Sequence, residues 1–206
     1  MTAVDLPALL ADRFPQVTSR ASRDFPAYNV PADQLLAFMQ FLRDERGFDL
    51  LTDISGVDWG MDAEPRFGVF YHLHSTKTQD YLRVATLCSA GEPPKIASMT
   101  PLWPSADWHE RETYDFFGIQ FEGHPDLRRI MMWDGYPYFP LRKEFPLAGL
   151  ETDLPDEEIA AETGVKVQPA PMAGGPFVAP QEDTVKEREP RARDESWNEK
   201  TPKPSA

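Results

Sequence analysis

The 206 residues are 41% hydrophobic and 27% charged, which is typical of a globular protein long enough for one domain with a core and an appendage. The net charge of −13 argues against a basic face for nucleic acid and against electrostatic attachment to anionic lipid, but leaves protein partners open. No apolar run approaches the roughly 18 residues of a membrane span, and residues 1–10 lack the pattern of a signal peptide, so we expect neither feature.

Two helices are predicted near the start of the chain. The first covers residues 5–14, where apolar side chains recur at helical spacing: Leu6, Leu9, Leu10 and Phe14. A connection follows, with a strand expected near Tyr28. The second helix is predicted to begin at Pro31-Ala32-Asp33 and to end before Gly47, with these residues on one face: Leu35, Leu36, Met39 and Leu42.

Strand patterns fill the middle of the chain. Residues 48–59 have strand-like composition, and residues 66–75 and 81–89 alternate apolar and polar side chains on either side of a polar turn. The last two segments predict an antiparallel hairpin. One more short strand is expected within residues 95–100.

This order of elements predicts an α+β domain over residues 1–149. Its two layers should be a mixed, mostly antiparallel sheet and helices that cover one face of that sheet. Residues 150–206 are acidic and rich in proline, with Phe177 and Trp197 as their aromatic residues, and cannot form a core of their own. We therefore expect an extended C-terminal tail that orders along a partner.

Residues 104–147 contain the densest mixture of charged and aromatic side chains. A helix is predicted to start at Ser105 or Asp107, either of which can cap it, and to run to about Phe117. Gly118 is expected to end the helix, because glycine readily adopts the left-handed conformation found after a helix.

Arg111 and Asp115 lie one helical turn apart and are expected to face each other. The aromatic side chains of the helix should point inward, and its charges should surround them. Residues 135–146 include three prolines and are predicted to form an extended, rigid loop on a surface.

Glu-Arg-Glu-Thr-Tyr-Asp-Phe-Phe-Gly at 110–118, its continuation to Ile130, and Pro-Leu-Arg-Lys-Glu-Phe-Pro at 140–146 closely resemble a known signature. It is that of the 30 kDa subunit of respiratory complex I, which in bacteria is the C-type subunit of NADH-quinone oxidoreductase. Glu144 departs from the family, which more often has aspartate there, and residues 133–139 are richer in tyrosine and proline than usual. The residues that carry the resemblance, and the predicted interface, are Glu110, Arg111, Glu112, Asp115, Gly118, His124, Pro125, Arg128, Arg129, Pro140, Arg142 and Lys143.

The resemblance implies a subunit of the peripheral arm of a proton-translocating NADH-quinone oxidoreductase, on the cytoplasmic side of the plasma membrane. The enzyme passes electrons from NADH through FMN and iron–sulfur clusters to quinone, and this family of subunits carries none of these cofactors. The implied partners are the quinone-site subunit, of the 49 kDa or D type, and other subunits of the arm. Relatives also serve quinone oxidoreductases with other electron donors and membrane-bound hydrogenases, so the donor stays open.

The residues themselves favour a chain without redox or catalytic groups. Cys88 is the only cysteine, so this chain alone cannot build a disulfide or a cysteine-ligated cluster, and we predict that Cys88 is a buried small hydrophobe. None of the 12 glycines belongs to a nucleotide-binding motif. His72 and His74 share a strand face, as in a two-histidine metal site, but without an obvious third ligand we interpret them as ordinary polar residues.

Two other functions are considered. In one, Glu112 and Asp115 with His124 form the acid–base site of a free-standing enzyme. We favour a network of salt bridges that fixes the helix to the following loop, with these candidate cations: Arg111, Arg128 and Arg129. In the other, the chain is an acidic adaptor whose tail binds several partners.

A cationic cluster is the candidate docking site for the complex I partner: Arg128, Arg129, Arg142 and Lys143.

Overall fold

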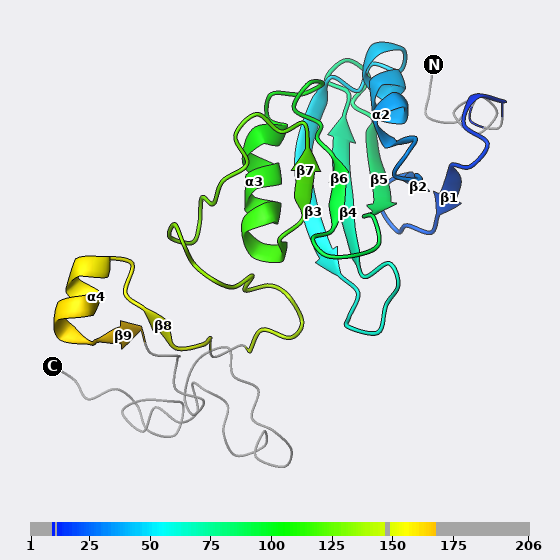
Figure 1. Ribbon diagram of the computed structural model, residues 1–206. Coiled ribbons are helices and arrows are strands. Elements are labelled where there is room, and N and C mark those ends of the chain that lie inside the picture. Colours follow the sequence, from blue (N-terminus) through cyan, green and yellow to red (C-terminus); the bar gives the residue numbers. More distant parts are fainter. Residues whose placement is uncertain (1–9, 11, 147–148, 168–206) are drawn as a thin grey trace, which may run out of the picture. The chain divides into compact units, whose positions relative to one another are not determined.

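The computed structural model describes residues 10, 12–146 and 149–167 of the chain (Figure 1). The chain divides into two units, Met1–Lys143 and Glu144–Ala206, and each is considered by itself. The domain boundary after residue 149 stays a prediction.

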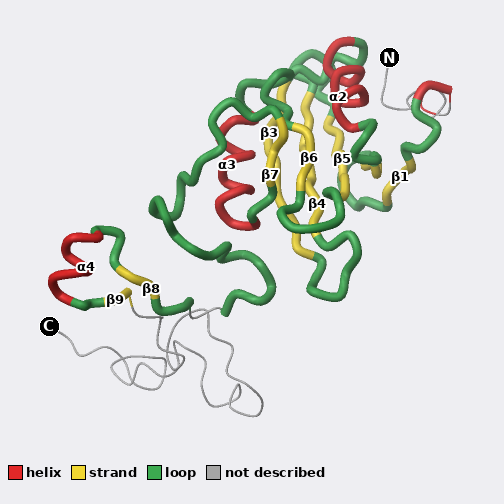
Figure 2. The backbone as a smooth tube through the Cα atoms, in the orientation of Figure 1, coloured by secondary structure: helices red, strands yellow, loops and turns green. Residues whose placement is uncertain are grey.

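A five-stranded sheet forms the centre of the first unit (Figures 1 and 2). Its strands lie in the order β1 (Thr18–Arg20), β2 (Ala27–Asn29), β5 (Tyr81–Leu87), β4 (Phe67–His74) and β3 (Leu50–Asp58). β2 and β5 are parallel, and the other neighbouring strands are antiparallel. The mixed, mostly antiparallel sheet is therefore confirmed.

β4 and β5 form the predicted hairpin. Tyr71 lies opposite Val84, and His72 lies opposite Arg83. The first pair is buried in the hydrophobic core, whereas the second pair is only half-buried. Because side chains alternate between the two faces of a strand, one face of the hairpin holds the core and the other carries polar groups.

Helix α2 (Leu35–Asp44) contributes its apolar face to the same core. The predicted Leu35, Met39 and Leu42 are buried, but Leu36 is 42% exposed, so its assignment to the buried face was wrong. Leu36 is rotated by about 100° from Leu35 around the helix axis, and Phe38 and Phe41 occupy the buried stripe instead. The helix also begins later than predicted, because residues 31–34 form a turn that ends with Gln34.

A second layer adds a small parallel pair, β6 (Lys95–Ala97) and β7 (Gln120–Glu122), which confirms the predicted short strand within residues 95–100. Helix α3 (Ala106–Phe117) connects the two strands and packs beside β3 (Figure 1). Ile96 and Phe121 join the core that contains Tyr71. The α+β class is confirmed.

The contact between α3 and β3 depends on a glycine. A Cβ atom added to Gly56 would lie 2.6 Å from Cδ2 of Phe117 and 2.9 Å from Cγ2 of Thr113. We expect Gly56→Ala to lower the free energy of unfolding by about 1–3 kcal/mol, because overpacking forces these side chains off their preferred positions. Urea denaturation measures this, and the exposed neighbour Ser55→Ala should change stability by less than about 0.5 kcal/mol. Equal effects of the two substitutions would contradict the close approach of helix and strand.

The described part of the second unit contains two short paired strands, β8 (Thr152–Asp153) and β9 (Lys166–Val167), with helix α4 (Glu157–Thr163) between them. The carboxylate of Asp156 caps α4 by accepting the N–H of Ile159, and Gly164 ends the helix in the left-handed conformation. None of the α4 residues is buried. The segment thus has local structure without a core of its own, and the proposed anchors Phe177 and Trp197 lie outside the described residues.

The predicted helix over residues 5–14 falls partly outside the described residues. Residues 10, 12 and 13 are helical, and residues 5–9 and 11 are not described. Leu10 and Phe14 are both buried in the core, as their spacing predicted.

Candidate protein-interaction site

Helix α3 begins after Ser105 and ends at Gly118, close to the predicted bounds. The Ser105 hydroxyl does not cap the helix but donates a hydrogen bond to the carbonyl oxygen of Leu51, 3.3 Å away. Gly118 adopts φ 75°, and its N–H donates to the carbonyl oxygen of Tyr114. A Cβ at Gly118 would also lie 2.7 Å from Phe139 and from Nη2 of Arg142. Glycine is therefore required both for the turn and for the approach of the loop.

The placement of charges on α3 differs from the one expected. Its charged residues Glu110, Arg111 and Asp115 are buried, whereas Trp108 is 63% exposed. The expectation that charges surround inward-pointing aromatic side chains was wrong for these charges and for Trp108, whereas Phe117 packs against the core. The charges lie inside because loop segments on either side of the helix supply hydrogen-bond partners to them, which offsets the cost of removing them from water.

Asp115 anchors the loop that follows β7. One carboxylate oxygen accepts the backbone N–H groups of Ile130, Met131 and Met132 at 2.9, 2.7 and 2.9 Å, and the other oxygen lies 2.6 Å from Nη1 of Arg129. Burial raises the pKa of Asp115, but these donors outweigh it and hold that pKa below its usual value. Asp115 therefore pairs with Arg129, not with Arg111 as expected.

The guanidinium group of Arg129 also binds the proline-rich segment. It donates to the carbonyl oxygens of Tyr136 and Tyr138, at 2.8 and 3.0 Å, and lies over the ring of Phe139. Arg142 attaches the later part of the same segment to α3, because its Nε donates a hydrogen bond to the carbonyl oxygen of Phe117 at 2.7 Å. It also pairs with Glu92 at 3.1 Å. Residues 135–146 have neither helix nor strand, as predicted, and these two arginines hold residues 136–142 against α3.

Asp58, at the end of β3, provides a third attachment point for the segment that contains Lys143. Its buried carboxylate accepts hydrogen bonds from Arg66, from the N–H of Gly60 and, at 2.8 Å, from the N–H of Lys143. Burial raises the pKa of Asp58, and these donors more than reverse that effect, so the pKa lies well below its usual value. Sequence reasoning missed this role. The available signal was Asp58 two residues before Gly60, because aspartate in a turn often accepts the N–H two positions later.

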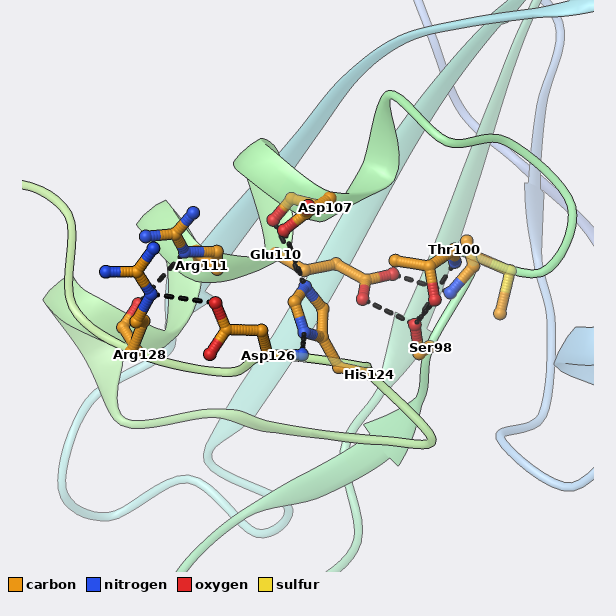
Figure 3. A network of polar contacts seen from close by, with 9 residues as sticks. Ser98, Thr100, Asp107, Glu110, Arg111, His124, Asp126 and Arg128 are labelled. Atoms are coloured by element: carbon orange, nitrogen blue, oxygen red, sulfur yellow. Dashed lines mark hydrogen bonds and ion pairs between the residues drawn. The ribbon is translucent and has the colours of Figure 1, made fainter.

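The side chain of Glu110 is fully buried and points from α3 toward Ser98 and Thr100, away from the loop that Asp115 binds (Figure 3). Its carboxyl group accepts a hydrogen bond from the Ser98 hydroxyl at 2.7 Å and another from the N–H of Met99, and Ser98 also contacts Thr100. Within the described residues it forms no ion pair. Burial raises the pKa of Glu110 to about 7, and the two hydrogen bonds only partly oppose this.

His124 links the first turn of α3 to the loop that follows β7 (Figure 3). Its Nε2 lies 3.2 Å from a carboxylate oxygen of Asp107, and its Nδ1 accepts the N–H of Asp126 at 3.0 Å. Arg128 forms an exposed ion pair with Asp126, while its carbonyl oxygen accepts a hydrogen bond from Arg111. Of the two predicted prolines, Pro125 is exposed and Pro140 is half-buried.

The structure does not assemble the acid–base site. Glu112 is exposed and has no hydrogen bond or ion pair in the part of the chain that is described. Asp115 is occupied by Arg129 and the loop, and His124 is bound to Asp107. The predicted salt-bridge network fits better, and of its three candidate cations Arg129 is the one that binds the Asp115 carboxylate.

The other chemical candidates also have structural roles. His72 lies between Asp53 and Arg83, with its Nδ1 3.2 Å from the carboxylate and its Nε2 accepting from the guanidinium group at 2.8 Å. His74 stacks on Tyr81. Among the described residues no group of three side chains is placed to hold a metal ion. Cys88 is buried as predicted, which raises its pKa to about 12 and leaves it unreactive.

Together these bonds hold residues 124–143 as a rigid layer on α3. The layer and the helix expose both apolar and cationic side chains, which we call the signature surface: Trp108, Arg128, Met131, Leu141 and Lys143. Trp108, Met131 and Leu141 are 63%, 62% and 53% exposed. Tryptophan, methionine and arginine are enriched at protein interfaces, so this arrangement is suited to binding another protein.

The model of one protein family, described as the 30 kDa subunit of respiratory-chain NADH dehydrogenase, matches residues 28–151. The chain belongs to this family. The match contains β3, β4, β5, α3 and the whole signature surface, whereas β1 lies outside it.

Named members of the 30 kDa family are similar over most of this domain. The NADH-quinone oxidoreductase C 2 subunit of Rhizobium meliloti is 47% identical over 136 residues, which cover 65% of this chain and 73% of the relative. The C subunit of the Moorella thermoacetica enzyme is 43% identical over 134 residues, or 65% and 88% of the two chains. The C/D subunit of the Sulfurihydrogenibium enzyme is 38% identical over 149 residues, which are 71% of this chain and 25% of the relative.

Two solved structures resemble the chain. The trypsin-resistant fragment (1–134) of Nqo5 is 31% identical with a TM-score of 0.52, and the match covers 59% of this chain and 98% of the fragment. A chain of an archaeal membrane-bound sulfane sulfur reductase has a TM-score of 0.61 over 79% of this chain and 91% of its own, and at 21% identity it supports the fold alone. Within the described residues, no helix is both long and apolar enough to cross a membrane.

Proposed function

We propose that this chain is a non-redox subunit of the peripheral arm of a proton-translocating NADH-quinone oxidoreductase, bound on the cytoplasmic side of the plasma membrane. Electrons pass from NADH through FMN and iron–sulfur clusters to quinone in other subunits, and this chain holds those subunits in place. Membership of the 30 kDa family and the names of the relatives support this proposal.

The proposed partner is the quinone-site subunit, of the 49 kDa or D type. One relative is named as a C/D subunit, so a chain similar to this one forms part of a protein whose name also includes the D type. This name supports a direct contact between the two subunits, which we assign to residues 110–146.

The observation that carries the proposal is the signature surface on its rigid support. Partly buried hydrogen bonds from Asp115, Asp58 and Arg129 hold the loop in place, so little conformational entropy is lost when a partner binds. The predicted cationic docking cluster falls into two pairs of residues with different roles. Arg129 and Arg142 are largely buried and hold the loop within the chain, whereas Lys143 and Arg128, with its ion pair to Asp126, are exposed to a partner.

We expect Arg128→Glu combined with Lys143→Glu to reduce the assembled complex about tenfold or more, because reversed charges would oppose the partner across the interface. The free energy of unfolding of the isolated chain should stay close to that of the wild type, since the Arg128 ion pair is exposed. Arg142 is unsuitable for this test, because its substitution would break the loop attachment. The measurement is a mild-detergent pull-down of the tagged chain from its native membranes, with mass spectrometry and an NADH-to-quinone assay.

A matched control reverses two exposed charges elsewhere, Arg13→Glu with Lys77→Glu. It should leave assembly unchanged. Equal loss of assembly in both double variants would refute the assignment of the signature surface. Recovery of the wild-type chain with iron–sulfur and flavin subunits and NADH-to-quinone activity is the expected result, whereas recovery with another electron-donating complex, or alone, would contradict the proposed function.

A further inference from the structure

A groove of about 250 Å³ lies on the face of the five-stranded sheet that points away from the core. Its floor is a row of side chains on three neighbouring strands: Asn29 on β2 is paired with Ala85 on β5, which is paired with Phe70 on β4. Trp59 and Leu87 also line the groove. None of these residues belongs to the signature surface.

Arg20 of β1 reaches across this row. Its Nη1 donates a hydrogen bond to the side-chain oxygen of Asn29 at 2.9 Å. The central carbon of its guanidinium group lies 5.1 Å from the ring centre of Phe70 and 5.9 Å from that of Trp59. Stacking on two aromatic rings and one hydrogen bond thus orient a cation within the groove.

Arg20 has no carboxylate partner among the residues that the structure describes. Two other arginines differ in this respect, because Arg83 of β5 pairs with Asp24, and Arg66, just before β4, pairs with Asp58. A guanidinium group has five N–H donors, and Asn29 accepts only one of them from Arg20. The remaining donors match the geometry of a carboxylate.

The groove also has apolar walls. Trp59 and Leu87 are 47% and 46% exposed, and the Trp59 ring lies edge-on to Phe70 with 6.3 Å between ring centres. A volume of 250 Å³ is below the roughly 300–1,000 Å³ of typical sites for cofactors and other small ligands, so it suits a few side chains of a peptide better. Exposed tryptophan next to arginine is the composition of an interface hot spot.

We propose that this groove binds an extended segment of a protein partner that carries an aspartate or glutamate next to an apolar residue. The carboxylate accepts hydrogen bonds from Arg20, and the apolar side chain packs on Trp59 and Leu87. Charge complementarity selects this occupant, because the groove presents one oriented cation within a chain whose net charge is −13. In the described part of the sheet β1 has β2 on one side and no strand on the other, which leaves room for an extended chain beside Arg20.

Photo-cross-linking in the native host tests this assignment. A photoreactive phenylalanine analogue replaces Leu87 in the full chain, and cross-linked peptides are identified by mass spectrometry. The expected product joins position 87 to one peptide of another protein, with an acidic residue within about five positions of the cross-link, the reach of an extended chain across the groove. Arg20→Gln should lower the cross-link yield about tenfold, because the charge-assisted hydrogen bonds are lost.

Arg23→Gln removes an equal charge from an exposed residue outside the groove and should leave the yield unchanged. Circular dichroism of each variant establishes that it is folded. The same analogue at Leu50, which is also exposed on the sheet, should not give this product. The proposal is overturned by a cross-link to lipid, to a second copy of this chain or to a peptide without acidic residues, or by a yield that does not depend on Arg20. Mass spectrometry identifies the partner peptide, so the two proposals can fail separately. An acidic peptide from a protein outside an NADH-quinone oxidoreductase would support the binding role of the groove and would contradict only the proposed function.

Discussion

Asp115→Asn is expected to lower the free energy of unfolding of the full chain by about 3–5 kcal/mol, because it removes the buried carboxylate that pairs with the Arg129 guanidinium, whose side chain is only 11% exposed. The amide that replaces the carboxylate also brings a donor toward three backbone N–H groups that need an acceptor. Chemical denaturation at pH 7 measures the loss.

The loss should begin in the loop. Hydrogen exchange at the amides of Ile130, Met131 and Met132 should become faster in this variant than in the wild type, since these are the groups that Asp115 binds. The variant should also fail to assemble, because the signature surface would no longer be held in one conformation.

Asp126→Asn is the matched control. Asp126 has an exposed ion pair with Arg128, so its substitution should change the free energy of unfolding far less than Asp115→Asn does. If the two aspartates proved equally tolerant, the role of Asp115 as the anchor of the loop would have to be abandoned.

Glu110 is expected to make stability fall as the pH rises from about 4.5 to about 7. The carboxyl group ionises near pH 4.5 in the unfolded chain, but burial keeps it protonated in the folded chain until its pKa of about 7. Over this window the unfolded state therefore binds fewer protons than the folded state, and unfolding is favoured as protons are removed. The difference of pKa corresponds to a loss on the order of 3 kcal/mol.

Glu110→Gln should abolish this dependence, because the amide keeps an acceptor for the N–H of Met99 and has no charge to bury. The free energy of unfolding of the variant minus that of the wild type should rise between pH 4.5 and pH 7 and then level off. Asp58 and Asp115 have lowered pKa values, so their contributions are lost in more acidic solution and do not overlap with this window. A set of urea titrations from about pH 4 to about pH 8 measures the difference.

Glu112→Gln is the control for this experiment. Glu112 lies two residues away on the same helix and is exposed, so its removal should leave the pH dependence of the wild type in place. A difference between Glu110→Gln and the wild type that stays constant with pH would rule out a buried, protonated Glu110.

The secondary structure followed largely from local pattern. Alternation over residues 66–75 and 81–89 predicted the hairpin, because successive side chains of a strand point to opposite faces of the sheet. The end of α3 at Gly118 was predicted for a similar reason, since the left-handed conformation there depends on one residue. Leu36 was misplaced because a hydrophobic residue beside a buried stripe looks the same in sequence as one within it.

The sequence by itself thus determined the α+β class, the family and the position of the signature. Only the tertiary structure decided which charges of the signature lie inside. Arg111 is nearer to Asp115 in sequence, but Arg129 reaches it because the loop after β7 folds back over α3. The pairing of β2 with β5 and the Arg20 groove likewise join residues far apart in the chain. Such contacts depend on how loops close and on which buried groups find partners, and these are properties of the whole fold that no local pattern encodes.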